Sequence, residues 1–244
     1  MRISIVIPVF NERHRIGVTL QKIASYFSSR PDFNHEIIVV NDGSCDDTAS
    51  IVDGISKTVA NISLINLGKN MGKGAAVKAG MLAAKGEYKF FMDADGSTAI
   101  EEIEKLLPFV FQGFRIVIGS RGVAGATIKK NQPCVRLVLG RIFRAIVNAI
   151  LPVGVVDSQN GFKLFAAETA NILFRKLNTT GWAFDVEILA LARISGFRVK
   201  EVPVIWTNDD DSKVTLKGMV NMLVELFLIR RSVVKIKSAN NKSH

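Results

Sequence analysis

The chain has few of the residues from which disulfide frameworks and zinc sites are built. Its 244 residues include 2 cysteines, Cys45 and Cys134, and 3 histidines. The cysteines form no C-x-x-C pair, so neither a disulfide framework nor a Cys/His zinc site is expected. The scarcity of cysteine favours a reducing compartment, and we predict a cytoplasmic protein.

Long apolar runs are also missing. The sequence has no uninterrupted apolar stretch of about 18 residues, the length that suggests a transmembrane helix. The longest apolar segments, 145–156 and 219–229, are interrupted by asparagine, proline or glutamate. Residues 1–9 lack the long apolar core and the cleavage site of a signal peptide and are expected to form a strand. Any contact with a membrane should therefore be confined to its surface.

Acidic residues are the minority among the charged ones. The chain has 32 Lys and Arg against 22 Asp and Glu, a formal net charge of +10. From residue 105 to residue 156 there is no acidic residue. The basic residues of this block are Lys105, Arg115, Arg121, Lys129, Lys130, Arg136, Arg141 and Arg144. This excess points to an anionic partner, for which nucleic acid, a membrane surface and a phosphorylated small molecule are the candidates.

What the chain does contain is the pattern of an α/β domain. Short apolar, β-branched runs occur at 3–9, 36–40, 62–65, 88–92 and 116–118. Between them lie helix-like segments, with apolar residues three and four apart, at 15–27, 46–59, 74–84 and 100–111. We predict a single domain over 1–244 with a doubly wound, mostly parallel sheet. Residues 1–120 are expected to form its nucleotide-binding half.

Beyond residue 120 the sequence predicts helices with apolar faces. Residues 133–151 have helical spacing, with apolar side chains on one face and arginines on the other. A strand at 162–165, helices from 168 and up to 195, and a strand at 198–204 are expected to follow. The last helix, about 215–236, is apolar around most of its circumference and ends among basic residues. The first and last of these helices either pack against the protein core or rest on a membrane surface.

Polar motifs follow three of the predicted strands. They are Asn11-Glu12, Asn41-Asp42-Gly43-Ser44 and Asp93-Ala94-Asp95-Gly96. Parallel strands place their carboxyl ends at one edge of a sheet, so the three loops should converge on one crevice. Two aspartates so placed can hold a divalent cation against a diphosphate, although turn formation and helix capping are the alternative for such a pair. Segment 68–74 resembles a phosphate loop, but its glycines are too close together for an ATP-hydrolysing site.

Taken in order, five segments resemble the motifs of the family 2 inverting glycosyltransferases. They are SIVIPVFNE (4–12), VVNDGS (39–44), NMGKG (70–74), DADG (93–96) and GSR (119–121). Four later segments resemble the polyprenyl-phosphate sugar transferases, most closely the dolichyl-phosphate glucosyltransferases. These are DSQNGFKLF (157–165), GWAFDVE (181–187), VPVIW (202–206) and SKV (212–214). The resemblance covers nearly the whole chain.

The resemblance implies a nucleotide-diphospho-sugar transferase fold of the GT-A type and assigns site residues. The nucleotide sugar would contact Pro8, Glu12, Asp42, Lys73, Asp93 and Arg121. Mg or Mn would bind Asp93 and Asp95, which with Asp185 are the expected catalytic residues. The acceptor would lie among Arg136, Arg141, Asp157, Gln159, Trp182 and Lys213. Residues 121–244 would then form an acceptor half whose C-terminal amphipathic helices hold the protein peripherally on a cytoplasmic membrane face.

The activity implied is transfer of a hexose, glucose from UDP-glucose, to a polyprenyl or dolichyl phosphate. The attacking phosphate oxygen is already anionic at neutral pH, so the reaction needs cations more than a general base. GDP-mannose and UDP-N-acetylglucosamine are the alternative donors. A sugar hydroxyl is the alternative acceptor, and it would require Asp185 or Asp157 as the base.

Two alternatives come from other classes of protein. One is a sugar-nucleotide-binding scaffold without activity, against which the acidic motif positions argue. The other is a nucleic-acid-binding module, suggested by the basic block. No recognised nucleic-acid motif accompanies that charge, so we expect no nucleic-acid partner. The sequence predicts no particular oligomeric state.

Overall fold

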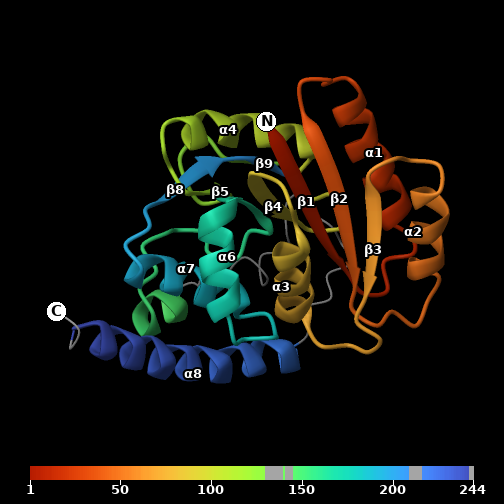
Figure 1. Ribbon diagram of the computed structural model, residues 1–244. Coiled ribbons are helices and arrows are strands. Elements are labelled where there is room, and N and C mark those ends of the chain that lie inside the picture. Colours follow the sequence, from red (N-terminus) through yellow and green to blue (C-terminus); the bar gives the residue numbers. More distant parts are fainter. Residues whose placement is uncertain (130–139, 141–144, 209–215, 242–244) are drawn as a thin grey trace.

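The computed structural model describes residues 1–129, 140, 145–208 and 216–241, which contain a seven-stranded sheet with helices on both faces and a separate two-stranded sheet (Figure 1). Each strand predicted from a short apolar run is present, and the helices predicted between them are present too. In chain order the elements are β1 (Arg2–Val9), α1 (Ile16–Ser28), β2 (Asn34–Asn41), α2 (Thr48–Ser56), β3 (Ile62–Asn66), α3 (Lys73–Ala83), β4 (Tyr88–Met92), η1 (Ile100–Glu102), α4 (Ile103–Phe111), β5 (Ile116–Ser120), β6 (Thr127–Ile128), β7 (Phe162–Ala166), α6 (Ala167–Lys176), α7 (Phe184–Ile194), β8 (Val199–Pro203), β9 (Ile205–Trp206) and α8 (Leu216–Asn241).

The seven-stranded sheet has the order β3-β2-β1-β4-β7-β5-β8. Its strands pair in parallel, except that β7 runs antiparallel to both β4 and β5. The predicted doubly wound, mostly parallel sheet is therefore confirmed. Since β7 comes from the second half of the chain and lies between two strands of the first half, one sheet contains strands from both halves.

Side chains alternate along the strands and form two apolar layers. In β1, Val6 belongs to a layer that includes residues of α3, α6, α7 and α8, whereas Ile5 and Ile7 belong to one that includes residues of α1, α2 and α4. This period of two is what a strand with both faces covered requires. It explains why the strand segments read as continuous apolar runs in the sequence.

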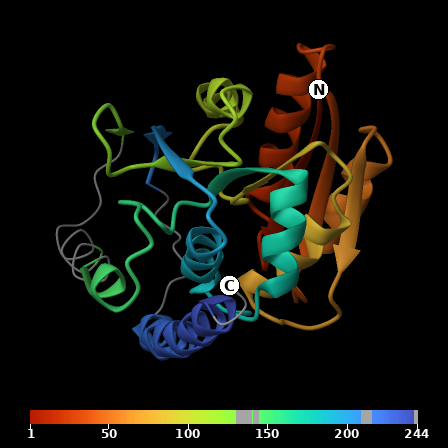
Figure 2. The same ribbon diagram turned by 60° about the vertical axis from the view of Figure 1, so that its left-hand side comes forward.

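The C-terminal helix α8 packs against the core through one face only. It lies beside α7 on the outside of the helical layer (Figures 1 and 2). Met222, Leu226 and Ile229 are buried in the core, while Phe227 and Leu228 are 60% and 63% exposed. The prediction of a core helix is confirmed for one side of α8, whereas the exposed apolar side chains on its other side leave contact with a membrane surface a prediction.

The other predicted amphipathic helix is described only in part. Of residues 133–151, those at 140 and 145–150 are helical, and Val147 and Leu151 are buried in the core. The start at Pro133 lies outside the described residues, as do the positions of Arg136, Arg141 and Arg144. No helix in the described part of the chain combines the length and the apolar character that spanning a bilayer requires.

Candidate active site

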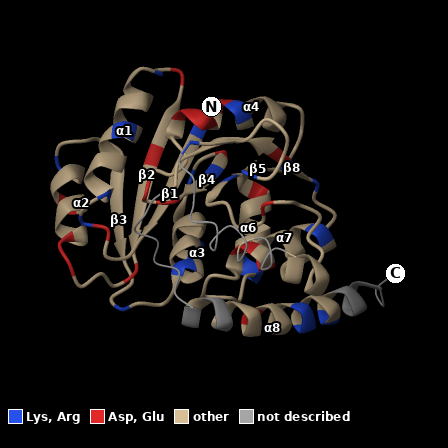
Figure 3. Ribbon diagram, turned by 180° about the vertical axis from the view of Figure 1, so that it is seen from behind, with Lys and Arg blue, Asp and Glu red and all other residues tan. Residues whose placement is uncertain are grey.

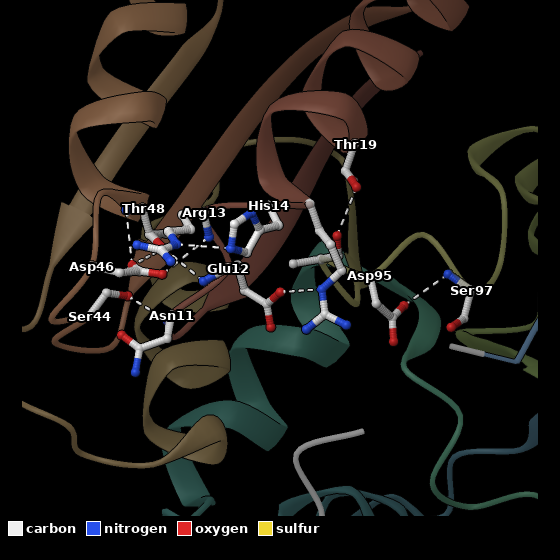
Figure 4. A network of polar contacts seen from close by, with 12 residues as sticks. Asn11, Glu12, Arg13, His14, Thr19, Ser44, Asp46, Thr48, Asp95 and Ser97 are labelled. Atoms are coloured by element: carbon white, nitrogen blue, oxygen red, sulfur yellow. Dashed lines mark hydrogen bonds and ion pairs between the residues drawn. The ribbon is translucent and has the colours of Figure 1, made fainter. Parts of the chain in front are cut away.

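The carboxyl ends of β1, β2 and β4 lie at one edge of the sheet, as predicted. Asn11 follows β1 and joins the loop after β2, because its backbone N–H donates to Ser44 Oγ (2.9 Å; Figure 4) and its Oδ1 accepts from the N–H of Cys45 (2.8 Å). Asn11 has a φ of 54°, in the left-handed region that asparagine tolerates better than most residues. These contacts fix the first two loops of the expected crevice to each other.

Pro8 and Glu12, predicted to contact the nucleoside, lie on either side of Asn11. Pro8 is half-buried in β1, and Glu12 is buried just after it. The backbone N–H of Glu12 donates to Thr48 Oγ1 (2.7 Å), and its carboxylate forms an ion pair with Arg15 (2.6 Å) (Figure 4). Both residues are therefore at the predicted edge of the sheet, and their contact with a nucleoside stays a prediction.

Asp42 organises the loop between β3 and α3. Its two carboxylate oxygens accept the backbone N–H groups of Met71 (2.6 Å) and Gly72 (2.9 Å). Burial raises the pKa of Asp42, against the opposing effect of these two donors. Gly72 has a φ of 98°, and a Cβ there would lie 2.4 Å from the carbonyl oxygen of Thr180. Asp42 and Gly72 thus bring the beginning of α3 against the 178–183 segment.

Lys73, Asp93 and Trp182 come together from three segments. Lys73 Nζ lies 2.6 Å from Asp93 Oδ1 and 5.2 Å from the centre of the Trp182 ring. A Cβ on Gly161 would lie 2.1 Å from Asp93 Oδ2, so this glycine lets the loop before β7 approach the carboxylate. Burial alone would lower the pKa of Lys73, but the charges of Asp93, Asp185 and Asp95 raise it. Lys73 is therefore a firmly protonated cation beside the first aspartate of the DADG motif.

Asp95, the second aspartate of that motif, closes a turn. Its Oδ1 accepts the backbone N–H of Ser97 (2.8 Å; Figure 4), and burial followed by the charge of Asp93 raises its pKa. Within the part of the chain that the structure describes, no group of three or more His, Cys, Asp or Glu side chains is placed to hold a metal. Two neighbouring carboxylates suit Mg²⁺, which commonly binds one or two carboxylates together with substrate phosphates and water. The residues present therefore fit a cation that arrives with a diphosphate.

Arg121 and Asp157 form a forked ion pair. Arg121 Nε and Nη2 donate to the two oxygens of Asp157 (2.7 Å each), and the backbone N–H of Arg121 donates to the same carboxylate (2.8 Å). The guanidinium lies 5.2 Å from the centre of the Trp206 ring. Glu201 of β8 accepts the backbone N–H groups of Val156 (2.8 Å) and Asp157 (3.0 Å). Arg121 is thereby held in place, and the charges of Asp93 and Asp185 also act on it.

Asp185, predicted to be catalytic, is paired with a lysine in the core. It lies in the first turn of α7 and accepts from Lys163 Nζ, which also donates to the carbonyl oxygen of Asn160 (2.6 Å). The Lys163 side chain is 0% exposed. Burial raises the pKa of Asp185 and lowers that of Lys163, against their mutual attraction. The catalytic role of Asp185 stays a prediction.

The remaining predicted acceptor residues divide into two groups. Gln159 is described, and its Nε2 lies 3.6 Å from Met222 Sδ of α8. The positions of Arg136, Arg141 and Lys213 lie outside the described residues. Three residues that hold segments of the site were not predicted from the sequence: Lys163, Glu201 and Glu225, the last of which accepts the backbone N–H of Ala183 (3.0 Å). Lys163 had a usable signal, because a lysine in an apolar strand segment needs a buried acidic partner.

Replacement of Asp157 by Asn is expected to lower the free energy of unfolding at neutral pH by about 2 kcal/mol, because the partly exposed Arg121 loses its charge-assisted hydrogen bonds to the carboxylate. The donors from Arg121 outweigh burial and lower the pKa of Asp157 in the folded protein. Its contribution to stability is therefore present above the unfolded pKa, about 3.9, and is lost as the pH falls through the lower folded value. Urea unfolding of both proteins from pH 7 to pH 3 should show the difference shrinking below about pH 4. A difference that stayed constant would contradict the ion pair.

Comparisons with known proteins agree with the motifs. Residues 4–171 match the model of the family described as Glycosyl transferase family 2. A dolichyl-phosphate beta-glucosyltransferase of Trichomonas vaginalis, ALG5C, is 40% identical over 235 residues, which cover 93% of this chain and 70% of that protein. The dolichyl-phosphate beta-glucosyltransferase of Homo sapiens is 33% identical over 243 residues, covering 94% of this chain and 75% of the human one.

Solved structures share the fold at low identity. Mannosyl-3-phosphoglycerate synthase from Rubrobacter xylanophilus is 17% identical with a TM-score of 0.68, over 100% of this chain and 76% of that one. Glucosyl-3-phosphoglycerate synthase from Mycobacterium tuberculosis, in complex with Mn²⁺, UDP and phosphoglyceric acid, is 18% identical with a TM-score of 0.65, over 95% and 78% of the two chains. These likenesses concern the fold alone, and they confirm the GT-A type expected from the sequence.

Proposed function

Since the chain belongs to glycosyl transferase family 2 and is therefore a glycosyltransferase, we propose that it transfers glucose from UDP-glucose to the phosphate of a polyprenyl or dolichyl lipid. The observation that carries the proposal is the likeness to dolichyl-phosphate beta-glucosyltransferases over 93% of the chain. The UDP and Mn²⁺ in the complex of similar fold support a uridine nucleotide and a divalent cation. GDP-mannose and UDP-N-acetylglucosamine remain the competing donors.

The proposed reaction is a single displacement at the sugar. An oxygen of the lipid phosphate forms a bond to C1 of glucose, the bond from C1 to the β-phosphate oxygen breaks, and UDP leaves with that bonding pair. Attack from the face opposite UDP inverts the configuration at C1. Asp93 and Asp95 would hold the divalent cation, which would supply positive charge against the leaving diphosphate. No proton has to be removed, because the phosphate oxygen is anionic at neutral pH.

The cationic side chains of the site have complementary tasks in this reaction. Lys73 lies within contact distance of Asp93 (2.6 Å), where it can donate to the diphosphate of the donor. Arg121 is held by Asp157, and the negative charges of Asp93 and Asp185 also raise its pKa. Its guanidinium therefore lies close to the carboxylates of the proposed donor site. Guanidinium and phosphate match each other in a two-point geometry. We assign Lys73 to the donor phosphates. The resemblance placed Arg121 at the nucleotide sugar, but because Asp157 of an acceptor motif holds its guanidinium, we assign Arg121 to phosphate on the acceptor side.

The hydroxyl acceptor is the less favoured alternative. It needs a carboxylate that can take up a proton, and Asp157 and Asp185 are the candidates. Asp157 is engaged by three donors from Arg121, which lower its pKa and make it a poor base. Asp185 is engaged by Lys163 and is almost completely buried. Burial raises the pKa of Asp185, but an almost completely buried carboxylate that already accepts from Lys163 is poorly placed to reach an acceptor hydroxyl. We therefore favour a phosphate acceptor, which needs no base.

The acceptor is tested by offering three compounds with labelled UDP-glucose: a short polyprenyl phosphate, the corresponding polyprenol and a soluble methyl glucoside. We expect labelling of the polyprenyl phosphate alone. Preferential labelling of the glucoside would contradict the lipid phosphate as acceptor and would show that the enzyme uses a hydroxyl acceptor instead.

We further propose that α8 rests on the surface of an anionic membrane, which makes the enzyme peripheral on a cytoplasmic membrane face. In Figure 1, β1 runs downward from the N-terminus and α8 lies along the bottom, at the end where the parallel strands of the site finish. Apolar Val224, Phe227 and Leu228 are exposed on this helix, and Arg230, Arg231 and Lys235 are exposed in the turns that follow. Figure 3 shows basic positions in blue along α8. Apolar burial together with basic residues near anionic headgroups is the usual basis of such contacts.

Replacing Phe227 and Leu228 together by serine is expected to weaken binding to vesicles of phosphatidylcholine and phosphatidylglycerol about tenfold or more, because both side chains lose apolar area in the contact. Vesicle sedimentation measures this directly. Val18→Ser, which removes an apolar side chain that is 53% exposed on α1, is the control and should bind as the wild type does. Equal binding of all three proteins would exclude α8 from the contact.

A further inference from the structure

Glu225 is the only acidic residue of α8, and it faces the protein. Its Oε2 accepts the backbone N–H of Ala183 (3.0 Å), and a Cβ on Gly181 would lie 2.1 Å from its Oε1. The carboxylate therefore lies against the backbone of the Gly181–Ala183 turn, and glycine at the first position is what admits it. Ala183 is the N-cap residue of α7, so Glu225 supplies a negative charge at the positive end of that helix.

The turn that Glu225 holds carries Trp182. Its other side is fixed by α3 and α7, because Thr180 O accepts the N–H of Ala75 (3.2 Å) and Glu187 accepts the N–H of Thr179 (2.7 Å). The ring of Trp182 forms a cation–π contact with the ammonium of Lys73, and that ammonium forms an ion pair with Asp93. Without the Glu225 carboxylate, the part of the turn that carries Trp182 would lose its hydrogen bond to α8.

A second contact joins α8 to the other acceptor loop. Gln159 Nε2 lies 3.6 Å from Met222 Sδ, one turn before Glu225 on the same face of the helix. One face of α8 thus contacts both loops that carry the acceptor motifs, while the opposite face exposes Phe227 and Leu228. The helix is the element that lies between the proposed lipid surface and the site.

We propose that Glu225 is a positioning residue that couples α8 to the Trp182 turn, so that seating α8 on a lipid surface orders the acceptor side of the site. This inference rests on the proposed function for the contact of α8 with lipid. It assigns to Glu225 no contact with substrate. Its effect is transmitted through the backbone of the turn to Trp182.

The test uses Glu225→Ala, Glu225→Gln and, as a matched control, Glu168→Ala, which removes an exposed first-turn carboxylate from α6. Each is made in the wild type for kinetics and in a Trp206→Phe background, which leaves Trp182 as the single tryptophan for fluorescence. Glu225→Ala is expected to lower kcat with polyprenyl phosphate in vesicles about tenfold, while the affinity for UDP with Mn²⁺ and for vesicles is unchanged. The shift of Trp182 emission on addition of vesicles should be lost.

Glu225→Gln keeps an oxygen that can accept the Ala183 N–H, so it should retain most of the emission shift and of kcat. Wild-type kcat together with a wild-type emission shift in Glu225→Ala would overturn the coupling. Failure of the wild type to bind vesicles would instead contradict the proposed membrane contact. In that case the role of Glu225 is tested by Trp182 emission in vesicle-free solution. Identical spectra of the Trp206→Phe protein with and without Glu225→Ala would show that the carboxylate does not position the turn.

Discussion

Asp95→Asn is expected to lower the rate of sugar transfer about a thousandfold, which corresponds to about 4 kcal/mol of transition-state stabilisation. Asp93 and Asp95 follow β4 at the edge of the sheet, where we propose that they hold a cation against the diphosphate. Asparagine keeps the side-chain oxygen that accepts the Ser97 N–H (2.8 Å), so the turn should be retained and only the charge removed. Initial rates at saturating Mn²⁺ measure the loss of transfer activity. Calorimetric titration with UDP in the presence of Mn²⁺ measures the binding of the nucleotide.

The stability of this variant distinguishes a lost ligand from a lost fold. Burial and the neighbouring charge of Asp93 raise the pKa of Asp95, so its ionised form is unfavourable in the folded protein when no cation is bound. Removing the charge should therefore leave the metal-free thermal midpoint unchanged or raise it. Asp53→Asn, which removes an exposed carboxylate paired with Lys57 on α2, is the matched control and should have wild-type activity. Wild-type activity in Asp95→Asn would remove the cation from the proposed reaction.

Asp185→Ala is expected to lower the free energy of unfolding by about 3–5 kcal/mol, the largest loss of stability that we predict. The loss of stability comes from Lys163, the buried partner of Asp185, rather than from Asp185 itself. Lys163 is 0% exposed, and after the substitution its ammonium would retain the carbonyl oxygen of Asn160 and the face of the Phe91 ring but would lose the carboxylate that it contacts. Urea unfolding followed by circular dichroism gives the difference.

A double-mutant cycle identifies the buried charge as the cause. Lys163→Met alone leaves Asp185 without its cation and should also be destabilising, whereas Lys163→Met with Asp185→Ala removes both charges and should be more stable than either single variant. Strict additivity of the two single losses would contradict the ion pair. The same cycle bears on catalysis, because a loss of activity in Asp185→Ala can be ascribed to the chemical step only if it persists in the stable double variant.

Local patterns in the sequence predicted the elements that depend on neighbouring residues. The apolar runs at 3–9 and 36–40 became β1 and β2 because both faces of these strands are covered, and the polar residues that follow them lie at the expected edge. The insertion of β7 between β4 and β5 was not predicted, because chain order does not specify which strands become neighbours. The strand pair β6 and β9 was also not predicted, since each is too short to give a pattern.

The sequence predicted which charged residues belong to the candidate site, but not which of them form ion pairs with each other. Asp93, Lys73 and Arg121 were identified from motifs, and the structure brings Lys73 to Asp93 and Arg121 to Asp157. The partners Lys163 and Glu225 belong to segments whose sequence predicts a strand and an apolar helix, and their contacts join residues far apart in the chain. Such contacts depend on how the elements pack, which local spacing does not specify.

The most direct test of the central claim is transfer of radiolabel from UDP-glucose to a short polyprenyl phosphate in detergent, with and without Mn²⁺ or Mg²⁺, and with GDP-mannose and UDP-N-acetylglucosamine in parallel. We predict labelled lipid from UDP-glucose, dependent on the metal and absent with Asp95→Asn. No labelled lipid from any of the three donors, under conditions in which UDP still binds, would contradict the assignment of a lipid phosphate as the acceptor.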